Sequence, residues 1–427
     1  TFFKGLICSE DFLYFLLVIV LFVTLSILRL QAERTKLSAL QSMLRYGGVI
    51  VVTLLIGYFS ARPALRCYYD ATEMKENTLT QNSIDIMEKL DGPLTITTYA
   101  NMFDENYFRA LPRYYNEDFN RFEKYIRFKP EIKMKYVYYY DKTNNPTLEQ
   151  RYPGLTDEQR LKKICDALDW DVKRVLTPEQ IRAKEDLSGE YNKYVRVIER
   201  GNGQKSYLRL YEDNYRHPTE TEISAALKRM VIKSPVVAFL TGHGERSIDG
   251  IGERDYYAFS QYKDFRNSLV NQGFESISLS LDSVNKVPEN IDILVISDVR
   301  TALSPKEQEI IENYIAEGRN LLIAGEPRRQ EQMNPLLAPL GLSFMPGILV
   351  QESKDFSTDL ILANPTMASL NVINRFDKLL AFGNQITMPS AVGIKQTDEK
   401  GFKVVPILTT DSTGSWNELE TTNFIED

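Results

Sequence analysis

The sequence has few of the residues and motifs that usually mark an enzyme. Its 427 residues include only two histidines and three cysteines, Cys8, Cys67 and Cys165. The cysteines lie too far apart to suggest a CxxC metal site or a disulfide framework. Neither the G-x-S-x-G turn of α/β-hydrolases nor the G-x-x-x-x-G-K-[ST] phosphate loop occurs. Gly250 and Gly252 lack the third glycine of a dinucleotide fingerprint. These absences argue against hydrolase, redox and nucleotide chemistry.

An excess of positive charge is also absent. The formal net charge is −7, which offers no basic footprint for nucleic acid, so no nucleic-acid partner is expected. Charge is missing from most of the run FLYFLLVIVLFVTLSILRL at residues 12–30, in which Arg29 is the first charged side chain. At about 1.5 Å per residue, a helix over this run spans most of a bilayer core of roughly 30 Å. We predict a transmembrane helix here.

A second apolar run, YGGVIVVTLLIGYFSA, follows at residues 46–61. The alternative to a second membrane span is a helix buried in a protein core. Pairing with the first run makes a membrane hairpin the simpler interpretation. We therefore predict that residues 1–66 form a transmembrane hairpin.

The segment between the two runs is basic. It carries four cations against one acid: Arg29, Arg34, Lys36 and Arg45 against Glu33. The positive-inside rule places such a segment on the cytoplasmic side. Both ends of the hairpin then face outward, and the chain after about residue 66 is predicted to be extracytoplasmic.

Residues 67–234 show the order helix, strand, helix, strand, helix, hairpin, helix. The expected elements lie at 80–90, 94–99, 107–128, 131–140, 156–168, 191–200 with 204–211, and 223–231. Thr156-Asp-Glu-Gln159 has the pattern of a capping box, and Gly201-Asn-Gly203 is a hairpin turn signal. This order is that of a thioredoxin-like domain. Without a CxxC motif, no redox chemistry is expected from it.

Residues 235–352 alternate strands with helices, a pattern typical of a parallel sheet. Strands are expected at 236–240, 276–281, 291–297, 320–324 and 344–350, and helices at 256–271, 305–317 and 335–340. Ser304-Pro-Lys-Glu307 is predicted to cap the helix that starts at 305. The overall fold class is α/β, with a flavodoxin/class I amidotransferase-like second domain. Residues 353–427 form a C-terminal extension for which the sequence indicates no definite architecture.

The turn Thr241-Gly-His-Gly-Glu245 is the strongest candidate site. It follows a strand of β-branched and aromatic residues, and ligands of open α/β sheets bind at the carboxyl ends of such strands. We predict a binding edge formed by Thr241, His243, Glu245 and Arg246. The alternative is a hydrolase that acts at this turn. Ser297 is the nearest positional candidate for its nucleophile, but Asp298 rather than glycine follows it.

A metal site at the same turn is a second alternative. His243 and Glu245 would need a third ligand, which Asp249, Glu253 or Asp255 could supply. A single histidine between two glycines more often orders a corner or a binding edge. We therefore predict no metal, no cofactor and no catalytic residue.

Tyrosines are concentrated in the first soluble domain. They are Tyr107, Tyr114, Tyr115, Tyr125, Tyr136, Tyr138, Tyr139 and Tyr140. One interpretation is a stacking surface for a sugar or a peptide. Strand propensity and helix packing account for most of them equally well, and we favour packing.

Three segments together resemble one family. They are Leu79-Thr-Gln-Asn-Ser83 before Leu90-Asp-Gly-Pro-Leu-Thr-Ile96, the Thr241–Glu245 turn, and Ile291–Ser297 followed by Leu303-Ser-Pro-Lys-Glu307. Over roughly residues 68–350 the chain resembles the GldG-type auxiliary component of gliding-motility-associated ABC transport systems. The resemblance implies a non-catalytic subunit in the bacterial inner membrane, with the bulk of the chain in the periplasm. It also implies a separate ABC ATPase as partner.

The opening segment Phe3-Lys-Gly-Leu-Ile-Cys-Ser-Glu-Asp-Phe-Leu-Tyr-Phe15 resembles the end of a GldF-like ABC permease. This resemblance implies that a permease C-terminus is fused to an anchor helix and the auxiliary subunit. The expected partners are then the ABC permease region, the ATPase and membrane lipid, with a homodimer as a further assembly. A membrane-tethered amidotransferase-like hydrolase and a glycan-binding module of a polysaccharide exporter are the alternative functions.

Overall fold

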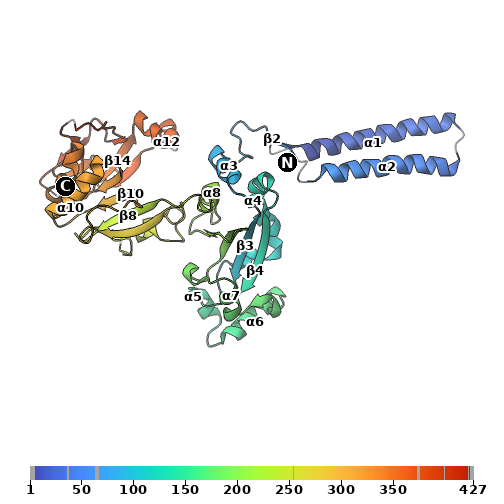
Figure 1. Cartoon of the computed structure of the whole chain (residues 1–427), viewed down its shortest axis with the longest axis horizontal. Helices are drawn as coiled ribbons and strands as arrows, with labels where there is room; N and C mark the ends of the chain where they lie inside the picture. Colours follow the sequence, from blue (N-terminus) through green and yellow to red (C-terminus); the bar gives the residue numbers. More distant parts are fainter. Residues whose placement is uncertain are drawn as a thin grey trace. The chain divides into compact units, whose positions relative to one another are not determined.

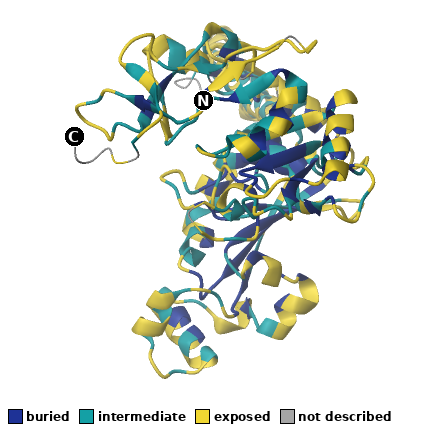
Figure 2. Cartoon of the chain, turned by 90° about the vertical axis from the view of Figure 1, so that its left-hand side faces the viewer, coloured by how far each residue is buried: buried dark blue, intermediate teal, exposed yellow. Residues whose placement is uncertain are grey.

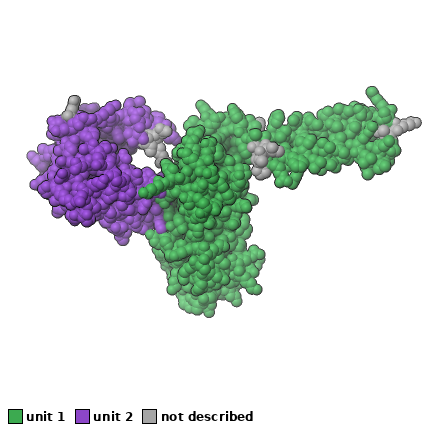
Figure 3. All heavy atoms as spheres, viewed as in Figure 1, with its two compact units in different colours: residues 1–233 green, residues 234–427 purple. Residues whose placement is uncertain are grey.

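The computed structural model describes residues 5–35, 38–62, 67–252, 254–372, 376–398, 400–421 and 423. The chain divides into two compact units, residues 1–233 and 234–427 (Figure 3). Each unit contains its own central sheet. Buried residues are concentrated in strands near the middle of each sheet, whereas most helices bury only one side (Figure 2).

Two long apolar helices open the first unit. Helix α1 (Ser9–Arg34) and helix α2 (Ala39–Ser60) lie side by side (Figure 1), and both are long and apolar enough to cross a membrane. Ser38 caps α2, because its Oγ accepts a hydrogen bond of 3.3 Å from the backbone N–H of Gln41. Neither helix contains a buried residue within the described part of the chain. The run at residues 46–61 is therefore not a core helix of this fold, and the two apolar surfaces support membrane anchoring.

The two ends of this hairpin are joined by a small antiparallel ribbon. Strand β1 (Leu6–Cys8) pairs with strand β2 (Tyr68–Asp70). The Asp70 carboxylate accepts hydrogen bonds from the backbone N–H groups of Thr72, at 3.0 Å, and Asn77, at 2.7 Å. Burial alone would raise the pKa of Asp70, but the bonds from Thr72 and Asn77 outweigh it and hold that pKa well below its usual range.

A five-stranded mixed sheet forms the centre of the first unit. Its strand order is β5-β4-β3-β6-β7. The strands are β3 (Leu94–Asn101), β4 (Lys133–Tyr139), β5 (Val175–Leu176), β6 (Val195–Arg200) and β7 (Lys205–Arg209). Strands β4 and β5 run parallel to β3, and β6 and β7 form an antiparallel hairpin beside it. The expected strands and hairpin are thus confirmed.

Helices cover both faces of this sheet. They are α3 (Gln81–Glu88), α4 (Tyr115–Phe128), α5 (Pro146–Arg151), α6 (Asp157–Leu168), α7 (Pro178–Lys184) and α8 (Glu220–Lys228). Side chains alternate along β3, so Ile96 packs with residues of α3, α4 and α8, whereas Tyr99 points to the opposite face and packs with Ile181 of α7. The predicted capping box at Thr156 is confirmed at the start of α6.

One helix of the first unit is shorter than expected. The sequence predicts a continuous helix over 107–128, but Tyr107–Ala110 and Pro112–Tyr114 form two 3₁₀ turns before α4 begins. Leu111, which precedes Pro112, has an extended backbone. A residue before proline disfavours the α conformation, and this restriction breaks the helix.

A four-stranded parallel sheet forms the centre of the second unit. Its order is β11-β10-β8-β9, with β8 (Val236–Thr241), β9 (Glu275–Ser280), β10 (Ile293–Ser297) and β11 (Asn320–Ala324). All three neighbouring pairs are parallel, as predicted. The chain moves from β8 outward to β9 and then returns to the other side of β8. This reversal creates a topological switch point between β8 and β10, the usual place for a ligand site in an open sheet.

The helices of the second unit match the sequence less closely. Helix α10 (Pro305–Ala316) carries the predicted Ser304–Glu307 capping box. The expected helix at 256–271 is wrong: only α9 (Tyr257–Ser260) forms, and turns follow it. The Asn271 side-chain amide donates to the backbone carbonyls of Lys263, at 2.9 Å, and Phe265, at 2.8 Å. In a helix these carbonyls would accept hydrogen bonds from backbone N–H groups. Here they accept from the Asn271 side chain instead, which keeps the segment in turns.

The remaining chain forms short elements, most of them paired antiparallel. They are α11 (Gln330–Leu337), β12 (Leu342–Phe344), β13 (Ile348–Gln351), β14 (Leu360–Pro365), α12 (Phe376–Phe382), β15 (Ile386–Pro389), β16 (Ile394–Gln396), β17 (Leu408–Thr409) and β18 (Ser415–Glu418). The strand expected at 344–350 is divided in two around Pro346 and Gly347. Strands β12 and β13 pair with β16 and β18, so the C-terminal segment belongs to the same compact unit.

Candidate functional site: the carboxyl edge of the parallel sheet

The turn after β8 depends on its two glycines. Gly242 and Gly244 have φ angles of 126° and 78°, and residues with a side chain rarely adopt such values. A Cβ on Gly244 would also lie 3.2 Å from the Cβ of Arg300. The backbone carbonyl of His243 accepts hydrogen bonds from the N–H groups of Arg300, at 2.9 Å, and Thr301, at 3.1 Å. The loops after β8 and β10 therefore meet at the switch point.

The His243 side chain lies between two carboxylates. Its Nδ1 is 3.5 Å from Glu245 Oε1, and its Nε2 is 3.3 Å from Glu307 Oε2. The side chains are 12% exposed for His243, 2% for Glu245 and 4% for Glu307. Glu245 also accepts a hydrogen bond of 2.6 Å from the His243 backbone N–H. The imidazole is mostly withdrawn from solvent and lies against Glu307 through Nε2. Its Nδ1 and the facing Oε1 of Glu245 are buried without a hydrogen-bond partner among the described residues.

Glu307 connects this histidine to the start of α10. Its carboxylate accepts hydrogen bonds from the Ser304 backbone N–H, at 2.8 Å, and hydroxyl, at 2.7 Å. Burial by itself would raise the pKa of Glu307, but the Ser304 hydrogen bonds and the nearby His243 outweigh it and lower that pKa. Glu307 is therefore ionised at neutral pH and draws a ring N–H of His243 toward it. Sequence reasoning missed this contact, although Glu307 was recognised as a helix cap.

Arg246 lies beside the histidine but points to another set of groups. Its guanidinium pairs with Glu326, donates from Nη1 to the Arg254 carbonyl at 3.0 Å, and lies 5.6 Å from the centre of the Tyr256 ring. Thr241 ends β8 opposite Ser280 of β9. The structure therefore brings His243 and Glu245 together, while Thr241 and Arg246 flank them on either side.

The loops after β10 and β11 add further charged groups. Asp298 is 2% exposed, has a φ of 54°, and lies 3.4 Å from both Arg300 Nη2 and Arg329 Nε. Arg300 and Arg329 keep side-chain exposures of 48% and 37%. Sequence reasoning did not select these arginines. Their position just after parallel strands was the available signal, because such loops meet at one edge.

The catalytic alternative finds no support in the hydrogen bonds of Ser297. Its hydroxyl donates to the Tyr256 hydroxyl at 2.7 Å. Within the part of the chain that the structure describes, no hydrogen bond links Ser297 to His243, whose ring contacts are the two glutamates. Ser297 is therefore not arranged as a nucleophile activated by His243.

The metal alternative likewise finds no ligand set. Asp249 accepts a bond from Gln261 Nε2 at 3.3 Å, and Asp255 accepts from the backbone N–H groups of Ser247, at 3.3 Å, and Gly252, at 3.1 Å. The third proposed ligand, Glu253, lies outside the described residues. Across the described residues, no group of three or more His, Cys, Asp or Glu side chains could hold a metal ion.

The whole edge lies in the part of the chain that matches a family model. Residues 234–425 match the family ABC_transp_aux, described as an ABC-type uncharacterized transport system. This match supports the assignment of the chain as an ABC transport auxiliary component. No curated protein matches the chain. Among solved structures, the chain is similar to the mmIFT52 N-terminal domain, with 14% identity and a TM-score of 0.31 over 42% of this chain and 75% of that one. That likeness is too remote to bear on function.

Proposed function

We propose that this protein is a non-catalytic, membrane-anchored auxiliary subunit of an ABC-type transport complex. The observation that carries the proposal is the family match over residues 234–425 in a chain that also has two exposed apolar helices. A separate ABC ATPase and the permease are then its partners, because the chain has no phosphate-binding loop of its own.

The finer form of the proposal is a GldG-type subunit fused to the end of a GldF-like permease and acting in gliding motility. The basic segment between the two helices supports a cytoplasmic position for the hairpin loop and a periplasmic position for the two units. The strand order β4-β3-β6-β7 is compatible with a thioredoxin-like first unit. The order β9-β8-β10-β11 is compatible with a flavodoxin/amidotransferase-like second unit.

The carboxyl edge of the second unit is the proposed contact surface for a partner or cargo. His243, Glu245 and Glu307 hold the β8 turn against α10. Arg300 and Arg329 share the single carboxylate of Asp298 and remain partly exposed. Glu245 and Glu307 are almost fully buried, whereas both arginines beside Asp298 are exposed. The surface next to Asp298 therefore presents guanidinium groups, which favour a partner with acidic side chains or other carboxylates.

Charge reversal at this edge tests the proposal. We expect Arg300→Glu combined with Arg329→Glu to reduce recovery of an extracytoplasmic partner by about tenfold or more in detergent pull-downs. Recovery of the ATPase should stay unchanged, because the ATPase would contact the cytoplasmic side. Lys233→Glu combined with Lys286→Glu is the matched control, because both lysines are exposed and precede β8 and β10, away from the carboxyl ends of these strands. Equal recovery of all proteins with the double variant and the control would refute the role of the edge.

A further inference from the structure

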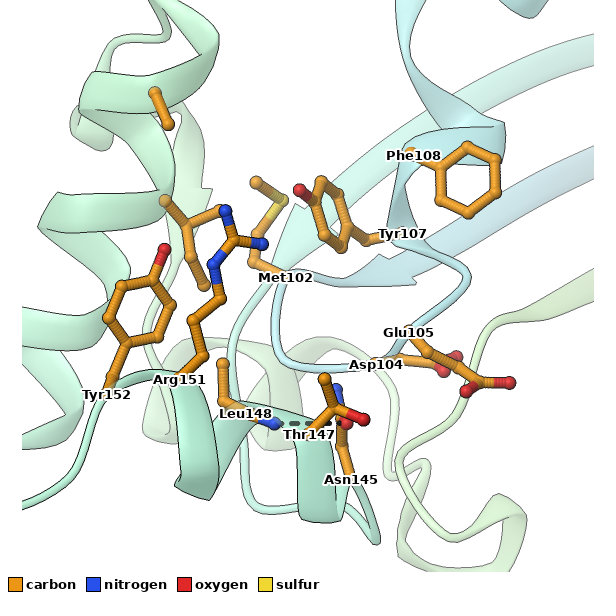
Figure 4. A pocket seen from close by; sticks show the side chains of 12 residues that line it. Met102, Asp104, Glu105, Tyr107, Phe108, Asn145, Thr147, Leu148, Arg151 and Tyr152 are labelled. Carbon is orange, nitrogen blue, oxygen red and sulfur yellow. Dashed lines mark hydrogen bonds between the residues drawn. The ribbon is translucent and has the colours of Figure 1, made fainter.

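The first unit contains a cavity that the proposed function does not use. It has a volume of about 350 Å³, within the usual range for small-ligand sites. It lies where β3 ends, between the loop that follows this strand and helices α5 and α6 (Figure 4). The inference drawn from it concerns a different unit from the carboxyl edge and stands independently of the transport proposal.

The cavity walls are mainly apolar and aromatic. Met102 and Ile164 are buried, and Leu148 is half-buried beside them. Tyr107 and Tyr152 supply two rings with hydroxyl groups (Figure 4). Such walls favour an apolar side chain or a ring over a strongly hydrated ligand.

Arg151 brings a positive charge into this cavity. Its guanidinium lies between Tyr152 and Tyr107 in Figure 4, and its Cζ is 5.6 Å from the centre of the Tyr152 ring. Among the described residues Arg151 forms no ion pair, so its fork of N–H donors is available for a ligand. The Tyr107 hydroxyl also makes no hydrogen bond within the described chain, and burial raises the pKa of Tyr107 although Arg151 opposes this. Tyr107 therefore keeps its proton and can donate.

The acids that line the cavity are already engaged. Asp104 accepts hydrogen bonds from the backbone N–H groups of Tyr194, at 2.5 Å, and Asn106, at 3.2 Å. Glu105 lies 3.7 Å from Arg216. Neither acid is therefore the partner of Arg151, and its guanidinium is left for a ligand.

We propose that this cavity binds the free carboxyl terminus of a peptide whose last side chain is apolar. The terminal carboxylate pairs with the Arg151 guanidinium and accepts a hydrogen bond from Tyr107. The last side chain packs against Met102, Leu148 and Ile164. Arginine suits this role because its planar fork binds both oxygens of a carboxylate.

The cavity fits a peptide terminus better than an acidic sugar. A sugar ring presents several hydroxyls that need acceptors, but both oxygens of Asp104 already accept backbone hydrogen bonds and Glu105 lies near Arg216. Asn145 is occupied as well, since its Oδ1 caps the Leu148 N–H at 3.2 Å and its Nδ2 donates to the Phe103 carbonyl at 2.7 Å. A sugar would therefore leave hydroxyls unpaired, which costs binding energy. An apolar last side chain needs no such acceptors, and its carboxylate can pair with Arg151 and Tyr107.

The test is a titration of the full chain in detergent with an acetylated Ala-Ala-Phe peptide that has a free carboxylate. We expect its affinity to fall by about tenfold or more when the carboxylate is replaced by an amide, or when Arg151→Gln removes the guanidinium. Ala167→Trp, at an exposed position lining the cavity, should also abolish binding by filling the space. Arg174→Gln is the matched control, because Arg174 is exposed and near a ring, 6.0 Å from Trp170, but does not line the cavity.

Several results would overturn the proposal. They are equal affinity for the acid and the amide, unchanged binding by Arg151→Gln, and no binding of the acid at millimolar concentration. Tighter binding of an oligogalacturonate than of the peptide would also reject it and would favour an acidic glycan. Failure of this titration would leave the transport proposal untouched, since that proposal is tested by recovery of the ATPase and permease.

Discussion

At the scale of single residues, His243 is an ordering group between two acids. Its ring faces Glu245 and Glu307, and its carbonyl binds the loop after β10. A lone histidine in a glycine-rich turn suggests catalysis at first sight. The contacts observed here instead connect the β8 turn, the β10 loop and the start of α10. We propose that the histidine shapes the edge on which the neighbouring arginines lie.

This arrangement predicts a specific dependence on pH. The folded-state pKa of Glu307 is lowered from the ordinary value of 4.5. Its ionised form therefore contributes stability that is fully present above that value and is lost as pH falls through the lowered pKa. We therefore compare thermal midpoints as the pH is lowered from about 6 to about 3. The midpoint of the native chain is expected to drop more than that of Glu307→Gln. Glutamine keeps the capping-box geometry but removes the charge that faces His243.

Glu309→Gln is the control for this measurement. It makes the same change of charge at an exposed position of α10. Its melting curve should follow that of the native chain through the acid range. If the midpoint of Glu307→Gln instead falls in parallel with those of the native chain and Glu309→Gln, the charge of Glu307 beside His243 contributes nothing to stability.

At the scale of helices and strands, local patterns predicted most of the two central sheets. The apolar runs of β8 and β10, and the caps at Thr156 and Ser304, are properties of adjacent residues, so they can be read without knowing the fold. The turns at 261–271 could not be predicted from adjacent residues, because the Asn271 side chain stabilises them by hydrogen bonds to carbonyls six and eight residues away.

Partners that are distant in sequence were missed for the same reason. Strand β13 pairs with β18, where Ile348 lies opposite Glu418. Neither short strand has a sequence pattern from which this pairing could be predicted. Arg300 follows β10, whereas Glu326 and Arg329 follow β11, and only the parallel sheet brings these two loops together. Sequence reasoning located the β8 turn but could not place these charges beside it.

A buried ion pair between α4 and β6 yields a prediction at this scale. Arg196 is fully buried, pairs with Asp118, and lies 5.0 Å from the centre of the Tyr194 ring. Asp118 also accepts a hydrogen bond of 3.0 Å from the Tyr136 hydroxyl. We expect Asp118→Ala to destabilise the first unit by about 3–5 kcal/mol, because it leaves a buried guanidinium without its anion.

Hydrogen exchange at the amides of α4 and β6 would measure this loss. Glu149→Ala is the control, since Glu149 is 66% exposed and its pair with Arg160 spans 2.7 Å at the surface. Such a pair contributes less than about 1 kcal/mol. The double variant Asp118→Leu with Arg196→Met should recover most of the loss. An Asp118→Ala effect as small as that of Glu149→Ala would show that the pair is not structurally important.

At the scale of the whole molecule, the chain combines a membrane hairpin with two α/β units. Helices α1 and α2 bury nothing within the described residues, so their apolar surfaces need lipid or partner helices. The second unit carries the family match and the edge with the exposed Arg300 and Arg329. The first unit carries the Arg151 cavity. An anchor with the two proposed binding surfaces would suit a subunit that connects a membrane transporter to its partners.

The most direct test of this account is co-purification of the native chain from membranes in mild detergent, followed by mass spectrometry. We predict that the chain is recovered in a complex with an ABC permease and with an ATPase that contains a G-x-x-x-x-G-K-[ST] loop. Recovery of the chain as a lone monomer, with neither protein present in any mild detergent, would contradict its assignment as a transport auxiliary subunit.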